Sequence, residues 1–216
     1  MILGLNQEEF EVAKELTNVA LANATESFSK MTGDKFTFQD IEVNINHFQL
    51  DPSFDSLKEP LYIMLTEYLG DVLADTFLVI NPENAEKIAS MLYPSPNINE
   101  ELKNAILLET DNIVAAAVAT KYADFLNHSV TGDVPKMVRK SPSETQKYIN
   151  DKLENDHTHF SFITNFKSEE HQLEAYFICA FRDSFGSAVK SIATKQETID
   201  LLDEQVGFTK QYLRDR

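Results

Sequence analysis

The sequence predicts an α+β protein in which long helices pack on a mainly antiparallel β-sheet. Three observations lead to this prediction: each half of the chain opens with a long segment of helical periodicity, continues with adjoining strand-like segments, and closes with a short helix. Adjoining strands favour antiparallel pairing, and an order that occurs twice indicates an internal duplication with pseudo-twofold symmetry. We expect one domain made of repeats at about 6–94 and 97–193, followed by a C-terminal helix at about 195–206 and a tail.

The first long segment has the features of an amphipathic helix. Asn6, followed three residues later by Glu9, predicts an N-cap with a capping box, and Gly33 predicts the C-terminal end. Between them, residues expected to face the core recur at helical spacing: Phe10, Ala13, Thr17, Ala20, Ala24, Phe28 and Met31. A helix of about 25 residues, rising roughly 1.5 Å per residue, would cross the whole molecule.

The remainder of the first half predicts strands and a short helix. The segment 41–48 alternates apolar and polar residues, and the segments 61–68 and 72–80 flank a Gly-Asp turn that is typical of a hairpin. Asn81 followed by Pro predicts a helix start, and this helix is expected to end at about Leu92.

The second half repeats this order. A long apolar helix is expected from Asn97–Glu100 to about Asn127. The polar segment 139–157 contains Ser-Pro-Ser, and we interpret it as an insertion or a mobile loop, with a brief helix left open. A second hairpin is expected from the segments 158–166 and 171–180, followed by a short helix capped by Asp183 or Ser184. A C-terminal helix is expected to open at 194 and to end at 207.

The composition excludes several classes of function. The formal net charge is −16, and no cluster of Lys and Arg interrupts the acidic character. Binding to nucleic acid through phosphate neutralisation is therefore not expected. The amino terminus lacks the features of a signal peptide, and no apolar stretch approaches the roughly 18 residues of a membrane span. We expect a cytoplasmic protein without membrane insertion.

Two short motifs are the candidate functional residues. Glu15 and Asn18 lie in the first long helix, Glu109 and Asn112 lie in the second, and the same sequence step separates the two acids and the two amides. Residues at i and i+3 are neighbours on a helix surface, so each motif presents a carboxylate beside a carboxamide.

An acid and an amide on a helix are usually ordinary surface polarity, but two features favour a functional interpretation here. The pair occupies the same place in both halves, and small residues lie near it: Ala22 in the first helix and Ala105, Ala116, Ala119 and Ala123 in the second. A face of small residues lets another protein approach closely. A third copy, Glu101 with Asn104, has no counterpart in the first half, and we interpret it as a chance match.

Other chemistries have weaker support in the sequence. His157 and His159 lie on one side of an expected strand, as a metal site requires, but no set of Cys or acidic residues with ligand spacing accompanies them. With six glycines and no Walker, Rossmann or G-x-S-x-G pattern, a phosphate-binding loop or a serine nucleophile is not expected. We therefore expect no metal or cofactor held by this chain.

These residues resemble the signature of the CheC/CheX/FliY family of chemotaxis phosphatases. That signature is an acidic residue or Ser, three spacers, Glu, two spacers and Asn, with a Pro twenty-three positions after the Asn. The second half supplies Glu109, Asn112 and Pro135, and has Ala105 at the first position. The first half has Glu11 at the acidic position before Glu15 and Asn18, and has Ile41 where the Pro would fall. The resemblance covers nearly the whole chain as two repeats, as in CheC.

The resemblance implies a phosphatase for a CheY-like response regulator that carries phosphoaspartate. It implies that Asn112 or Asn18 orients the hydrolytic water, that Glu109 or Glu15 pairs with a lysine of the regulator, and that Mg²⁺ resides on the regulator. It also implies that a CheD-like deamidase is a possible partner. Two alternatives stay open: a non-catalytic adaptor of the same fold that binds a regulator or a flagellar switch component, and a metal-dependent enzyme that uses His157 and His159.

Overall fold

The computed structural model describes residues 4–39, 41–45, 54, 57, 60–153, 160–202 and 204–205. In chain order, the helices and strands are α1 (Gln7–Thr32), β1 (Thr37–Phe38), β2 (Glu42–Ile45), β3 (Leu61–Gly70), β4 (Ala74–Ile80), α2 (Pro82–Leu92), α3 (Glu100–Leu126), β5 (Val130–Gly132), β6 (Lys136–Lys140), α4 (Pro142–Leu153), β7 (Phe160–Ser168), β8 (Leu173–Phe181) and α5 (Asp183–Ala193). Residues 196–202 are also helical, as expected for the C-terminal helix. The α+β class is confirmed.

The strands form one eight-stranded sheet in the order β1-β7-β8-β4-β3-β5, in which β2 also pairs with β7 and β6 also pairs with β3. Every pairing is antiparallel. Both expected hairpins are present, and they meet at β4 and β8 in the middle of the sheet. The strands at each edge come from the opposite half of the chain. The division into two repeats stays a prediction, and this symmetric strand order is the observation in its favour.

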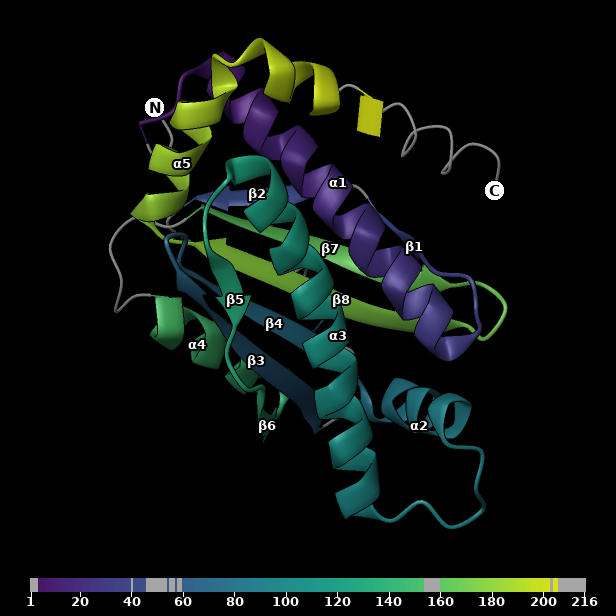
Figure 1. Cartoon of the computed structure of the whole chain (residues 1–216). Helices are drawn as coiled ribbons and strands as arrows, with labels where there is room; N and C mark the ends of the chain where they lie inside the picture. Colours follow the sequence, from purple (N-terminus) through teal and green to yellow (C-terminus); the bar gives the residue numbers. More distant parts are fainter. Residues whose placement is uncertain are drawn as a thin grey trace.

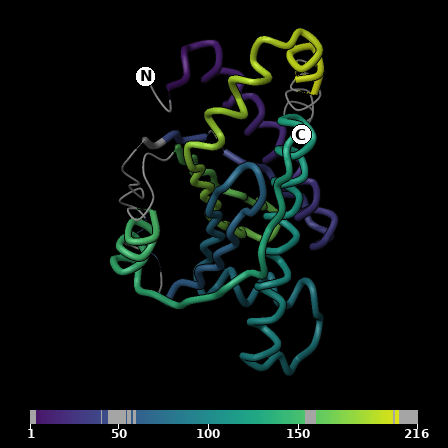
Figure 2. Tube along the Cα trace, turned by 60° about the vertical axis from the view of Figure 1, so that its left-hand side comes forward, coloured from purple at the N-terminus to yellow at the C-terminus, as the bar shows by residue number. Residues whose placement is uncertain are grey.

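The sheet has a helical layer on each face. The long helices α1 and α3 cover one face, and α4 covers the other (Figure 1). Figure 2 shows the strands between α3 and α4. Side chains of β3 alternate between the two cores: Tyr62 and Met64 belong to the core beneath α1 and α3, whereas Ile63 and Leu65 belong to the core beneath α4. None of the described helices is both long and apolar enough to cross a membrane.

The caps of α1 are those that the sequence predicts, whereas the N-cap of α3 is Asn99 and not Asn97 of the expected Asn97–Glu100 start. Asn6 and Glu9 form the capping box of α1, and Gly33 ends this helix with a positive φ of 71°. The side chain of Asn99 accepts a hydrogen bond from the Leu102 amide at the start of α3, and Asn127 ends that helix in the left-handed conformation.

The interpretation of residues 139–157 as an insertion or mobile loop is wrong for its first part. Strand β6 extends through residue 140, and α4 follows directly. Four residues of α4 at helical spacing are buried against the second face of the sheet: Pro142, Thr145, Ile149 and Leu153. Residues 154–159 lie outside the described part of the chain, as do residues 46–48 of the expected strand 41–48.

The start of α5 also differs from the expectation. Its N-cap is Arg182, which makes no capping hydrogen bond through its side chain. The Ser184 hydroxyl instead accepts a hydrogen bond from the Leu73 amide at 3.0 Å, and thereby ties α5 to the turn before β4.

Candidate functional site

The two helices that carry the candidate residues pack against each other in opposite directions. The Thr17 and Tyr122 hydroxyls lie 3.0 Å apart, and the Asn23 amide donates to the Ala117 carbonyl oxygen at 2.8 Å. Residue numbers therefore rise along α1 as they fall along α3. As a consequence, the Glu15/Asn18 pair and the Glu109/Asn112 pair lie toward opposite ends of this helix pair rather than beside each other.

Glu109 and Asn112 lie on a solvent-exposed stripe of α3. Both side chains are exposed, and neither has a hydrogen bond or an ion pair with another described residue. The exposed positions follow the helical period along α3: Glu101, Ala105, Glu109, Asn112, Ala116 and Thr120. The carboxylate and the carboxamide are therefore both available to a partner.

Glu15 and Asn18 are in a different environment. Both are half-buried, and the Asn18 amide donates to Glu15 Oε2 at 3.2 Å. Glu11, one turn earlier, is exposed. The first pair is therefore present as a joined acid and amide, in which one of the two N–H groups of Asn18 is bonded to Glu15.

A buried acid lies directly next to Asn112 in the sequence, and sequence reasoning missed it. Asp111 points toward the sheet, where its Oδ2 accepts a hydrogen bond from the Thr66 hydroxyl at 2.7 Å. Its Oδ1 has no partner, and complete burial raises the pKa of this carboxyl to about 7. A signal was available, because Asp111 falls on the inward stripe of α3 with Leu107, Val114 and Val118.

The alanines around Asn112 divide into two groups. Ala105 and Ala116 are exposed on the same stripe as Asn112, as the sequence predicts. Ala119 is only 3% exposed, and Ala123 packs against the core. The exposed small-residue surface is therefore narrower than the sequence indicates, and it extends one turn to either side of the Glu109/Asn112 pair.

Pro135 lies in the short segment between β5 and β6, two strands that pair one after the other with the same strand, β3. Gly132 of β5 pairs with Tyr68, and Lys136 of β6 pairs with Leu65, so the bulge at residues 133–135 faces only Thr66 and Glu67. A proline, which lacks an amide hydrogen, is suited to such a break. Thr66, whose hydroxyl donates to Asp111, is thus also one of the two residues opposite this bulge.

In the third Glu-x-x-Asn copy, Glu101 with Asn104, the amide has a structural role. Asn104 accepts a hydrogen bond from Arg139 Nη2 at 2.9 Å, and Arg139 also pairs with Glu100. The guanidinium group lies 4.4 Å from the centre of the Tyr62 ring. Asn104 therefore joins the first turns of α3 to β6, unlike Asn112.

His157 and His159, the residues of the metal-dependent alternative, lie outside the described residues. His171, which stands alone in the sequence, has a neighbour in space: its Nδ1 lies 2.9 Å from Asp34 Oδ2. Among the described residues, these two and Glu170 form a group with metal-ligand spacing. This group lies at the C-terminal end of α1 and shares no residue with the Glu/Asn pairs.

Comparisons with known proteins place this fold among chemotaxis proteins. No family model and no curated protein matches the sequence. FliY from Thermotoga maritima has a similar structure, with a TM-score of 0.60, 15% identity, and coverage of 89% of this chain and 99% of that chain. CheX from Borrelia burgdorferi, in a complex with CheY, BeF3 and Mg²⁺, has a TM-score of 0.52, 15% identity, and coverage of 76% of this chain and 96% of that chain.

The FliM middle domain from Vibrio alginolyticus is also similar, with a TM-score of 0.55, 6% identity, and coverage of 84% of this chain and 99% of that chain. The chain therefore has the fold of the CheC/CheX/FliY chemotaxis proteins. At these identities the likeness concerns the fold, and the finer expectation of a closest relation to two-site CheC stays a prediction.

Proposed function

We propose that this chain is a phosphatase that hydrolyses the phosphoaspartate of a CheY-like response regulator, with Asn112 holding the attacking water. The observation that carries this proposal is the exposed Glu109/Asn112 pair, whose polar atoms have no partner among the described residues. The fold supports it, because a CheX of this fold was crystallised with CheY, BeF3 and Mg²⁺.

The chemistry requires few groups from this chain. Hydrolysis of an acyl phosphate needs a water molecule in line with the departing carboxylate, and positioning dominates phosphoryl-transfer catalysis. The Asn112 carboxamide has both an acceptor and donors, so it can orient such a water. Glu109, one turn earlier on the same stripe, would pair with a lysine of the regulator and fix the docking.

The surroundings of Asn112 suit close approach by another protein. Ala105 and Ala116 are exposed one turn to either side of the pair, and neither carries a side chain that would hold a docking surface away. The Mg²⁺ ion and the phosphoaspartate belong to the regulator, so this chain contributes no cofactor to the reaction. A CheD-like partner stays an expectation from the family resemblance.

The test is the release of phosphate from a phosphorylated CheY-like regulator mixed with substoichiometric amounts of the full chain. We expect the chain to accelerate release, and an Asn18→Ala, Asn112→Ala double variant with native circular dichroism to lose the acceleration. An undiminished rate in the double variant would contradict the proposal. Adding His157→Ala and His159→Ala separately tests the metal-dependent alternative, and we expect these changes to leave the rate unaltered.

A second candidate function is a non-catalytic adaptor that binds a regulator or a flagellar switch component. The similarity to the FliM middle domain and to FliY favours it, and so does Ala105, which stands where the family signature has an acid or Ser. Binding of a regulator activated with beryllofluoride, without faster release of phosphate from the phosphorylated form, would favour the adaptor.

A further inference from the structure

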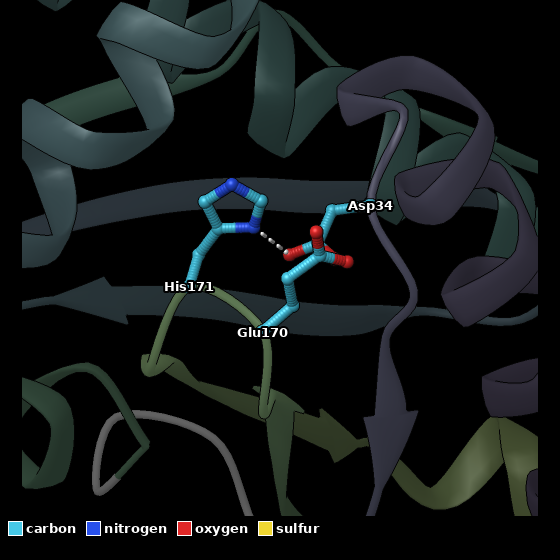
Figure 3. A group of neighbouring side chains, drawn as sticks. All are labelled: Asp34, Glu170 and His171. Carbon is cyan, nitrogen blue, oxygen red and sulfur yellow. Dashed lines mark hydrogen bonds and ion pairs between the residues drawn. The ribbon is translucent and has the colours of Figure 1, made fainter.

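A group of three metal-ligating side chains lies where the end of α1 meets the turn between β7 and β8. Asp34 follows the Gly33 cap of α1, and Glu170 and His171 belong to the turn (Figure 3). One ligand atom from each of the three side chains can be chosen so that all lie within 4.8 Å of one another. Residues far apart in the sequence therefore present two carboxylates and an imidazole to one point.

Asp34 is held rigidly in this group. Its side chain is only 1% exposed. Oδ1 accepts a hydrogen bond from the Lys35 amide at 2.6 Å, and Oδ2 accepts one from the Ser168 hydroxyl and lies 2.9 Å from His171 Nδ1. Hydrogen bonds of this kind from surrounding groups orient the ligands of metal sites. Asp34 is therefore a fixed ligand around which the other two side chains can adjust.

The two other side chains are free to adjust. Glu170 is exposed and has no hydrogen bond or ion pair among the described residues, although its carboxylate lies beside that of Asp34 (Figure 3). The His171 side chain is 45% exposed. Ligand atoms around a tetrahedral ion are separated by roughly 3.3 Å, as metal–ligand distances of about 2.0–2.2 Å require, so a small movement of Glu170 closes the set.

Space for a further ligand adjoins the group. An open cavity of about 460 Å³ is lined by Lys35, Thr37, Lys167, Glu169 and Glu170. The ammonium group of Lys167 is already paired with Glu174 at 3.0 Å. A water molecule in this cavity could complete a four-coordinate site.

We propose that Asp34, Glu170 and His171 bind a divalent transition-metal ion of the Zn²⁺ class, which ties the β7–β8 turn to the end of α1. An imidazole with carboxylates suits Zn²⁺ or Co²⁺, whereas Mg²⁺ and Ca²⁺ take oxygen ligands. The ion would replace the proton between His171 Nδ1 and Asp34 Oδ2. This site shares no residue with the Glu109/Asn112 pair, so its test is independent of the phosphatase proposal.

The test is a Zn²⁺ titration of the tag-free full chain after treatment with a chelator, followed by competition with a chromophoric chelator. We expect the chain to bind one ion, to unfold at a higher temperature with Zn²⁺, and to give a tetrahedral absorption spectrum with Co²⁺. Loss of a group that merely hydrogen-bonds to a metal ligand lowers metal affinity by about 10- to 100-fold. Loss of a ligand itself, in Glu170→Gln or His171→Gln, should therefore weaken Zn²⁺ binding by at least that factor.

Two matched controls separate this site from ordinary surface binding. Glu26→Gln changes an exposed acid of α1 outside this cavity, and His128→Gln changes a half-buried histidine elsewhere; both should bind Zn²⁺ as the wild type does. Absence of a bound ion, or equal affinity in Glu170→Gln and His171→Gln, would overturn the proposal. It would also fail if His171→Gln bound normally and a His157→Gln, His159→Gln variant did not.

Discussion

At the scale of single residues, adjacent positions of α3 have opposite roles. Asn112 is exposed to solvent, whereas Asp111 is completely buried and bound to Thr66. A buried carboxyl with an unpartnered oxygen is costly when it is ionised. Since its pKa is raised from 3.8 to about 7, the folded protein keeps this proton at pH values where the unfolded chain has released it. Stability from this residue therefore falls as the pH rises from about 4 to about 7.

The first prediction concerns Asp111→Asn, which keeps the shape of the protonated acid without its charge. We expect the free energy of unfolding of the variant to exceed that of the wild type increasingly between about pH 4 and pH 7. The difference should approach an upper value of roughly 4 kcal/mol, since one pKa unit corresponds to about 1.4 kcal/mol. Denaturant titrations over this range measure it, and parallel curves for the two proteins would show that Asp111 is not the titrating group.

The second prediction concerns the inequality of the two Glu/Asn pairs. Asn18 is half-buried and donates to Glu15, whereas Asn112 is exposed and has no partner among the described residues. We therefore expect Asn18→Ala to reduce the rate of phosphate release less than Asn112→Ala does. Initial rates of the two single variants at equal regulator concentration measure this. A larger loss in Asn18→Ala would assign the main site to α1.

The sequence predicts some of these residues and not others, for physical reasons. The positions of Glu109 and Asn112 follow from helical periodicity alone, and both are exposed as expected. The same periodicity places Asp111 on the inward face of α3, with Leu107 and Val114. The contact between His171 and Asp34 joins residues 137 positions apart, and no local pattern contains that information.

At the scale of elements, helix ends and hairpins are predictable because their signals are local. The capping residues Asn6, Asn81 and Asn99 each bind a backbone amide three residues later. The helix α4 is indicated in the sequence only as a possible brief helix, because its sequence is polar and its four buried positions include a proline and a threonine. Strands β1 and β5 are two and three residues long and exist through pairing with distant strands.

The third prediction tests the packing of α4. Ile149 is fully buried in the core beneath α4, so Ile149→Ala should lower the free energy of unfolding by about 2–4 kcal/mol. Lys147→Ala, at an exposed position of the same helix, is the control and should change stability by less than about 0.5 kcal/mol. Equal stabilities of the two variants would mean that α4 does not cover this face of the sheet in solution.

At the scale of the whole molecule, the fold places the two Glu/Asn pairs toward opposite ends of one helix pair. The α+β class, the two long helices and the two hairpins follow from the repeated pattern. The exchange of edge strands between the halves does not follow from this pattern: β2 pairs with β7, and both β5 and β6 pair with β3. With a net charge of −16, the chain offers little long-range attraction to an acidic partner, so the proposed function requires recognition through local fit around Asn112.

The most direct measurement of the central claim is the rate of phosphate release with Asn112→Ala, compared with wild type and with Asn104→Ala. Asn104 belongs to a Glu-x-x-Asn motif in the same helix but binds Arg139, so it is a matched control. If Asn112 positions the attacking water, its loss should slow release by about 100-fold or more, with native stability and unaltered binding of the regulator, while Asn104→Ala stays close to wild type. A wild-type rate in Asn112→Ala would contradict the account.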